Sequence, residues 1–187
     1  MVRRASDHKP TVEEVRAARG KRIPDVLEVG LDVVFCGVNP GLYSGAVGFH
    51  FARPGNRFWP ALRDSGFTDR ILKPHEQGLL PEYGLGLTNL VGRATAVAAE
   101  LSGSELRRGR GVLKKRLSRY RPRFVAVLGI GAYRTAFDEP VAKPGLQEAR
   151  IKGVGVWLLP NPSGLNAHYQ RQDLAKLFSE LREHVRS

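Results

Sequence analysis

The sequence predicts an α/β protein with a mostly parallel central sheet of about four strands, covered by helices on both faces. The order of its apolar patterns and its length support this fold class. Short apolar runs rich in β-branched residues alternate with longer stretches whose apolar residues recur at helical spacing. Strands that alternate with helices build parallel sheets, because a helix must carry the chain back across the sheet. A chain of 187 residues can bury a substantial core as one domain.

Four apolar runs bounded by turn-forming residues are the strand candidates: residues 32–38, 85–90, 124–129 and 154–159. The third run is the clearest, since every residue before Gly129 is apolar, whereas the second is interrupted by Gly86. The Gly-rich stretch 41–48 predicts a loop after the first strand.

Helix signals fill the segments between these runs. Ser102 and Glu105 have capping-box spacing and predict a helix that continues to about Tyr120. Asn56 is a candidate N-cap for a helix that stops near Gly66. Further helices are predicted at residues 11–18, through Tyr133 and Phe137, and at about 171–185.

The charge balance indicates a polyanionic partner. Lys and Arg number 30 against 18 Asp and Glu, which gives a net charge of +12 and a pI near 10.4. Nucleic acid is the first candidate for this partner and an anionic membrane surface the second. The alternative is that the positive charge reflects only a proteome that is basic overall. One face of the predicted helix at 102–120 is either a solvated surface or a binding surface. Its cations are Arg107, Arg108, Lys114, Lys115 and Arg119.

The cysteine and histidine content argues against disulfide and metal sites. The single cysteine, Cys36, lies within the first strand candidate, and the five histidines lack metal-ligand spacing. We therefore expect no metal and no cofactor. No apolar run is long enough to span a bilayer, and the charged N-terminus lacks a signal segment. We expect a cytoplasmic monomer that does not bind membranes, with residues 1–22 as a basic, partly flexible extension and residues 23–187 as a single domain.

The first strand candidate ends in Gly37-Val38-Asn39-Pro40-Gly41, the turn around which we expect the function to be organised. Ligands bind at the carboxyl ends of strands in open parallel sheets, so Asn39 would meet a substrate there. Pro40 restrains the backbone of Asn39, and Gly41 leaves room for a close approach. These residue types are also common in ordinary turns, and that alternative stays open.

The fourth strand candidate ends in a similar loop, Asn161-Pro162-Ser163-Gly164-Leu165-Asn166. Neither loop matches a phosphate-cradling loop, a dinucleotide fingerprint or a nucleophile elbow. Together with a third segment, Phe51-Ala52-Arg53-Pro54-Gly55-Asn56-Arg57-Phe58-Trp59, the two loops closely resemble the mismatch-specific uracil/thymine DNA glycosylases. Residues 67–70, 72–74 and 88–91 add to the likeness, which runs from about residue 27 to residue 185.

This resemblance implies a three-layer α/β/α fold of the uracil-DNA glycosylase type. It implies binding of double-stranded DNA with G·U or G·T mismatches and hydrolysis of the N-glycosidic bond of the damaged base, the step that initiates base excision repair. The base would be uracil, with thymine and etheno- or alkylated bases as further candidates, and it would be flipped out of the duplex. Neither loop holds a lysine that could act as an amine nucleophile, so we expect a monofunctional enzyme.

The resemblance also implies roles for single residues. Asn39 matches the catalytic residue that positions the attacking water. Phe51 matches the aromatic side chain that stacks on the flipped base, and Asn161 the amide that recognises it. The base-binding pocket would also include Gly37, Val38 and Gly41. The wedge that enters the duplex and contacts the widowed guanine would consist of Ser163, Gly164, Leu165 and Asn166.

Two positions depart from the family pattern. Gly92 stands where relatives commonly have an acidic residue, and Ala167 stands where some have arginine. If the acid assists catalysis in relatives, its help is absent here. Two other functions stay open: a nucleic-acid-binding module of the same fold with weak or no activity, and a hydrolase of free nucleosides. The positive charge and the apolar wedge argue against free nucleosides, which need neither.

Overall fold

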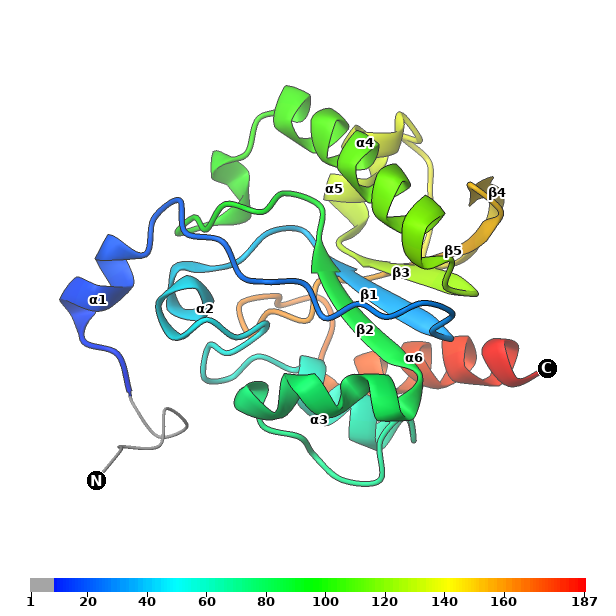
Figure 1. Ribbon diagram of the computed structural model, residues 1–187, viewed down its shortest axis with the longest axis horizontal. Helices are drawn as coiled ribbons and strands as arrows, with labels where there is room; N and C mark the ends of the chain where they lie inside the picture. Colours follow the sequence, from blue (N-terminus) through cyan, green and yellow to red (C-terminus); the bar gives the residue numbers. More distant parts are fainter. Residues whose placement is uncertain (1–8) are drawn as a thin grey trace.

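A computed structural model describes residues 9–187, which fold around one five-stranded sheet (Figure 1). The strand order is β2-β1-β3-β5-β4. Four strands are parallel: β1 (Val33–Gly37), β2 (Leu85–Asn89), β3 (Phe124–Leu128) and β5 (Val154–Leu159). They confirm the four predicted strands and the mostly parallel sheet.

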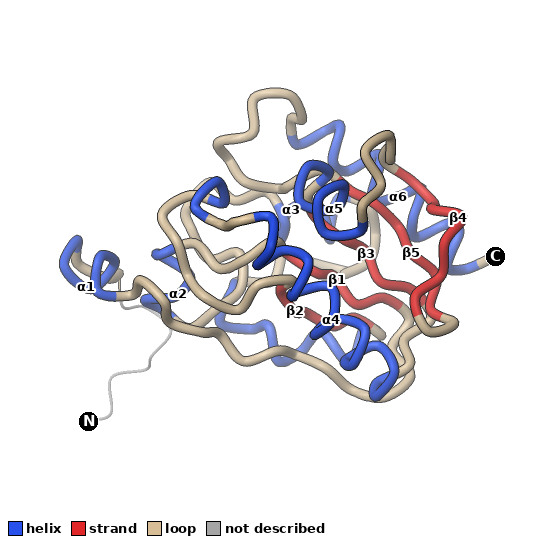
Figure 2. Tube along the Cα trace, turned by 90° about the horizontal axis from the view of Figure 1, so that it is seen from above, coloured by secondary structure: helices blue, strands red, loops and turns tan. Residues whose placement is uncertain are grey.

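The fifth strand, β4 (Gly145–Ile151), was not expected from the sequence. It pairs antiparallel with β5 at the edge of the sheet, where Figure 2 shows it as the outermost strand. Most of its side chains are exposed or half-buried, including those of Glu148 and Arg150. An edge strand of this kind lacks the continuous apolar run that reveals a buried parallel strand.

Helices cover both faces of the sheet and give the three layers (Figure 1). On one face, α3 (Phe58–Asp64) and α6 (Arg171–Arg186) pack against β1. There, Phe35 stacks on Phe178 with ring centroids 5.5 Å apart and meets Phe58 edge-on at 5.3 Å. On the other face, α4 (Gly103–Tyr120) and α5 (Ile130–Phe137) cover β3 and β5. The expected α/β/α architecture is therefore confirmed.

Capping residues fix several helix starts. The Ser102–Glu105 capping box opens α4 as predicted, and a second capping box, Thr11 with Glu14, opens α1 (Val12–Ala17). The N-cap of α3 is Arg57 and not Asn56 as expected; the Asn56 side chain instead accepts a hydrogen bond from the Phe58 backbone N–H at 2.9 Å in the turn just before the helix. The chain also forms two 3₁₀ helices, η1 (Pro74–Tyr83) and η2 (Ala98–Glu100).

The expectation of a loop at residues 41–48 is wrong. The segment forms the short helix α2 (Leu42–Val47), with Gly41 as its N-cap and Gly48 in the left-handed conformation at its end. Gly45 is buried close to Ala18 and Ala94, so the lack of a side chain lets α2 approach α1 and the segment after β2. Tertiary packing has overridden the low helix propensity of glycine here.

The carboxyl ends of the four parallel strands meet at one edge of the sheet. Gly37, the last residue of β1, is in register with Asn89 of β2 and Leu128 of β3, and Leu128 is in register with Leu159 of β5. The loops that follow these strands are therefore neighbours in space. In the part of the chain that the structure describes, no helix is both long and apolar enough to cross a membrane.

Candidate active site

A cavity of about 250 Å³ opens at this carboxyl edge. It brings together seven of the predicted site residues: Val38, Asn39, Gly41, Phe51, Asn161, Ser163 and Leu165. The other three lie beside it. Gly37 borders Phe51 and Asn89, Gly164 packs on the backbone of Gly55, and Asn166 lines an adjoining hollow.

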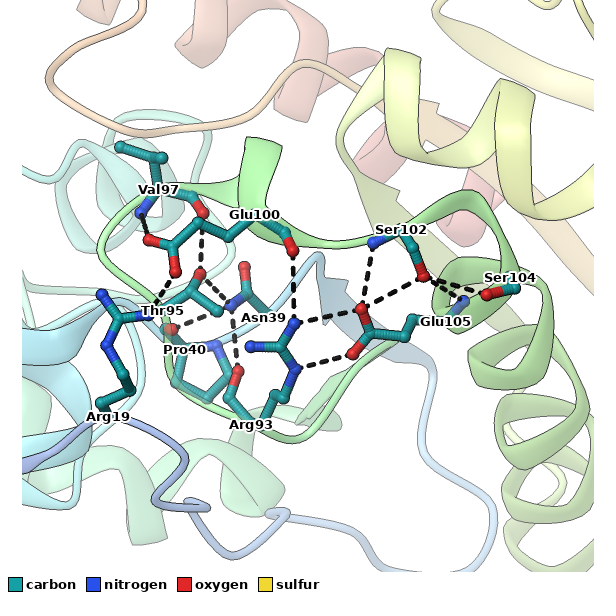
Figure 3. A network of polar contacts seen from close by, with 10 residues as sticks. All are labelled: Arg19, Asn39, Pro40, Arg93, Thr95, Val97, Glu100, Ser102, Ser104 and Glu105. Carbon is teal, nitrogen blue, oxygen red and sulfur yellow. Dashed lines mark hydrogen bonds and ion pairs between the residues drawn. The ribbon is translucent and has the colours of Figure 1, made fainter.

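The Asn39 side chain is held by its amide nitrogen. Nδ2 donates to the backbone carbonyls of Pro40 at 3.1 Å and Arg93 at 3.0 Å, and to Thr95 Oγ1 at 2.7 Å (Figure 3). Carbonyl oxygens can only accept, which fixes the orientation of the amide. Within residues 9–187, no group donates to Asn39 Oδ1. Asn39 Oδ1 is therefore a restrained acceptor at the cavity that can receive a hydrogen bond from a bound molecule.

The segment that holds Asn39 is itself anchored to α4. Thr95 Oγ1 donates to the Val97 carbonyl at 2.8 Å, and Arg93 forms a bidentate ion pair with Glu105 at 2.6 and 3.0 Å (Figure 3). The Arg93 guanidinium, followed by the Ser102 backbone N–H, lowers the pKa of Glu105 to about 2. Glu105 therefore stays ionised and keeps Arg93 in place over the whole physiological range of pH.

Phe51 supplies an aromatic wall. Its ring lies against Phe58, with ring centroids 4.2 Å apart and an angle of 28° between the planes. A Cβ built on Gly37 would lie 3.2 Å from Phe51 Cζ, so only glycine at position 37 lets the ring come so close to β1. Phe51 also has a positive φ of 52°, which is uncommon for an aromatic residue and is typical of positions constrained by function or packing.

A second amide, Asn89, faces the cavity from the end of β2. The ring of His50 lies 3.0 Å from the Pro24 carbonyl through Nε2, so Nε2 carries the proton and Nδ1 accepts from Asn89 Nδ2 at 3.3 Å. Burial lowers the pKa of His50 and favours this neutral form. Asn89 Oδ1 consequently points toward Gly37, where it lies 2.6 Å from the position that a Cβ would take.

The loop at 161–166 presents a hydrogen-bond donor, whereas Asn89 presents an acceptor. Asn161 Oδ1 accepts from the Ser163 N–H at 2.9 Å, so only its Nδ2 group remains to donate. Asn166 Nδ2 donates back to the Asn161 carbonyl at 3.0 Å. Leu165, at the tip, is 67% exposed although it is a large apolar residue. An exposed leucine beside a polar cavity is available to contact a partner.

Arg57 holds this loop to the rest of the domain. Its Nη1 donates to the carbonyls of Asn166 at 2.9 Å and Tyr169 at 2.7 Å, and its backbone N–H donates to Pro162 at 2.9 Å. Longer contacts reach the carbonyls of Ser163 and Gly164. One guanidinium thus satisfies several carbonyls that the turn would otherwise leave unpaired.

Gly92 lies outside the cavity lining. A Cβ built on it would lie 3.6 Å from Arg22 Nη1, so a guanidinium stands beside the position at which relatives commonly have an acidic residue. Ala167 is exposed next to the wedge residues.

Sequence reasoning missed Thr95, His50 and Arg57. Each acts through a contact with a residue more than 25 positions away in the chain, and no local sequence pattern predicts such a contact. Asn89 appeared only as part of a matching motif. Its position as a polar residue at the carboxyl end of a strand candidate, close to where Asn39 stands relative to the first one, was the available signal.

The described residues contain no group of three or more His, Cys, Asp or Glu side chains that could hold a metal ion. Burial raises the pKa of the Cys36 thiol to about 12, so Cys36 is no nucleophile at neutral pH.

Two comparisons relate this geometry to known proteins. A family model described as the uracil DNA glycosylase superfamily matches residues 24–186. The fold is similar to the solution NMR structure of a candidate uracil DNA glycosylase from Methanosarcina acetivorans, with a TM-score of 0.60 at 17% identity. That similarity covers 90% of this chain and 99% of the other, and it demonstrates a shared fold.

Proposed function

Because the chain belongs to the uracil DNA glycosylase superfamily, we propose that it is a monofunctional, mismatch-specific DNA glycosylase. It removes uracil opposite guanine from double-stranded DNA by hydrolysing the N-glycosidic bond. The observation that carries the proposal is the cavity beside Phe51 into which Asn39 presents an amide oxygen with no partner in residues 9–187.

Asn39 Oδ1 accepts a hydrogen bond from water and orients it toward C1′ of the flipped nucleotide. Since Nδ2 is held by three acceptors, the oxygen is preorganised, and little rearrangement is needed at the moment of reaction. None of the described residues that line the cavity is Asp, Glu or Lys. We therefore expect slow hydrolysis that depends on bases that leave readily, and no covalent amine intermediate.

Two other amides that line the cavity, those of Asn89 and Asn161, suit the edge of uracil. Uracil and thymine present an N–H between two carbonyls. Asn89 Oδ1 can accept from that N–H, and Asn161 Nδ2 can donate to a carbonyl. Cytosine has a lone pair in place of the N–H, which the Asn89 oxygen would repel. A site built to hydrogen-bond one pattern rejects the other because buried polar groups would stay unpaired.

The experiment is incubation with labelled duplexes that carry G·U, A·U or G·T, and with single-stranded uracil, followed by alkaline cleavage of any abasic site. We expect cleavage of G·U above A·U and of both above the single strand. Strand cleavage without the alkaline step would contradict the monofunctional assignment.

Gly41 bears on the range of bases. It borders the cavity, and a Cβ built on it meets no atom within 4 Å, so a larger side chain fits there. Gly41→Tyr should keep uracil excision and lose thymine and fused-ring bases by filling the space beside C5 of the base. Equal loss on every base would mean that the substitution had disturbed α2, which begins at this residue.

One observation favours a second candidate, a nucleic-acid-binding module without turnover. Arg22 occupies the surroundings of Gly92, where an acidic side chain is commonly found in relatives. Tight binding of G·U duplexes with no excision of any of the four substrates would favour that candidate over the glycosylase.

A further inference from the structure

A separate hollow of about 410 Å³ lies on the exposed side of α4, away from the cavity described above. Its lining consists of Lys114, Lys115, Ser118, Arg119 and Lys152. We call it the basic hollow. Four of its five lining side chains are cations and none is an acid.

The basic hollow lies at the opposite edge of the sheet from the catalytic cavity. The last residue of α4, Tyr120, accepts a hydrogen bond from the Gly30 N–H, just before β1 begins. Lys152 lies in the turn between β4 and β5, and β5 starts beside Phe124, the first residue of β3. β1 and β3 are each five residues long, so about 16 Å of sheet separates the two edges at about 3.3 Å per residue.

The cations of the basic hollow are not neutralised by the protein. Elsewhere on α4, Arg107 and Arg110 pair with Asp138, and Arg116 pairs with Asp25 at 2.8 Å. In residues 9–187, by contrast, no carboxylate forms an ion pair with any of the four cations of the basic hollow.

The fold alone does not account for this clustering. Cations near the end of a helix are favoured by its dipole, which explains Arg119, and Arg119 also lies over the Tyr120 ring at 5.3 Å. Lys115 and Arg119 are four residues apart, however, and like charges at this spacing destabilise a helix. Lys152 comes from a different element and adds to the same repulsion. An anionic partner would relieve it.

We propose that the basic hollow is a second DNA-binding site, which holds the phosphate backbone of a duplex other than the one whose base occupies the catalytic cavity. This inference rests on the proposed function. The lining offers four cations and one hydroxyl, which suit the phosphate oxygens that every duplex presents. A protein with two such sites passes directly from one DNA segment to another without first becoming free.

Dissociation kinetics test this directly. A preformed complex with a fluorescent G·U duplex is mixed with increasing concentrations of undamaged duplex at constant, low salt. Direct transfer makes the dissociation rate rise with competitor concentration, and we expect a rise of about tenfold, the lower end of the gains that electrostatic focusing gives to association. A dissociation rate that is independent of competitor overturns the proposal.

The variant Lys114→Glu/Lys115→Glu/Lys152→Glu should abolish this dependence. The matched control Lys73→Glu/Lys143→Glu/Lys176→Glu reverses three exposed lysines outside the basic hollow and should retain it. Equal loss in both variants would mean that overall charge is responsible, which contradicts a defined site. The neutral variant Lys114→Gln/Lys115→Gln/Lys152→Gln repeats the test with less risk to folding.

Two further measurements separate the possible failures. Single-turnover excision from a short G·U duplex should be equal in the wild type and all three lysine variants, and the dissociation assay needs no excision at all. An inactive protein that still shows competitor-dependent dissociation would therefore refute only the proposed function. If inorganic phosphate binds the wild type and not the Lys→Gln variant while the dissociation rate is independent of competitor DNA, the basic hollow binds small anions only, and the DNA assignment is wrong.

Discussion

The loops at 37–41 and 161–166 meet at one cavity, but they are held in different ways. The first, the catalytic loop, extends the sheet: the N–H groups of Leu90 and Val91 donate to the carbonyls of Gly37 and Val38 at 2.8 and 2.9 Å. The second, the wedge loop, has its own internal turns and one external clamp, Arg57.

The difference matches the role that we propose for each loop. A catalytic loop must aim one oxygen at one atom, and several independent hydrogen bonds make its position insensitive to the loss of any single one. A wedge loop must follow the shape of a duplex, which varies, and one clamp leaves it room to adjust. The predictions below test this contrast.

The largest effect should come from Asn39→Ala. Loss of the oriented oxygen should reduce single-turnover excision of uracil by about 10²-fold or more, the size of effect that follows when a reactant is no longer held in position. Affinity for the G·U duplex, measured by fluorescence anisotropy, should stay within about twofold because no phosphate contact is removed. Excision at the wild-type rate would exclude Asn39 as the catalytic residue.

Leu165→Ala should reduce excision from a well-paired duplex by about ten- to a hundredfold. Burial of one leucine contributes about 1.5–3 kcal/mol, comparable to the cost of unstacking a base. The loss should be smaller opposite an abasic site and least on a single strand, where no base stack closes behind the flipped nucleotide. A uniform loss on all three substrates would identify Leu165 as a structural anchor.

Arg57→Gln should act through the same wedge and reduce excision from duplexes by about three- to tenfold, with little effect on single strands. Because Arg57 serves to position Leu165, the double variant Arg57→Gln/Leu165→Ala should be no slower than Leu165→Ala alone. Multiplied losses in the double variant would show that the two residues act independently.

The smallest effect should come from Thr95→Val. Asn39 Nδ2 keeps its two carbonyl acceptors, so the loss of one hydrogen bond should slow excision by about twofold to threefold, the lower end for one hydrogen bond, on duplex and single strand alike. Thr95→Ser keeps the hydroxyl and serves as the control. A loss as large as that of Asn39→Ala would mean that the catalytic loop also depends on a single contact.

Patterns within one segment were predictable, and contacts between segments were not. The buried strands and the capping box at Ser102 follow from local residue order, so they could be predicted. The Arg57 clamp joins residues more than 100 positions apart, and β4 is too exposed to leave an apolar run. The helix α2 escaped prediction because its glycines reflect close packing and not a turn.

Gly109 lets α4, which carries most of the basic hollow, pack closely on the chain that leaves β2 near the catalytic loop. Any side chain there would drive its Cβ to within 2.4 Å of the Leu90 carbonyl oxygen, so α4 rests directly on the chain leaving β2. A glycine inside a helix lowers stability by about 0.5–1 kcal/mol relative to alanine. Here it allows α4 to pack closely on the sheet. Arg116 adds a hydrogen bond to the Asn89 carbonyl at 3.0 Å. The helix therefore works as a rigid spacer: it sets the distance from the basic hollow to the catalytic loop, so two bound DNA segments would be held at a fixed separation.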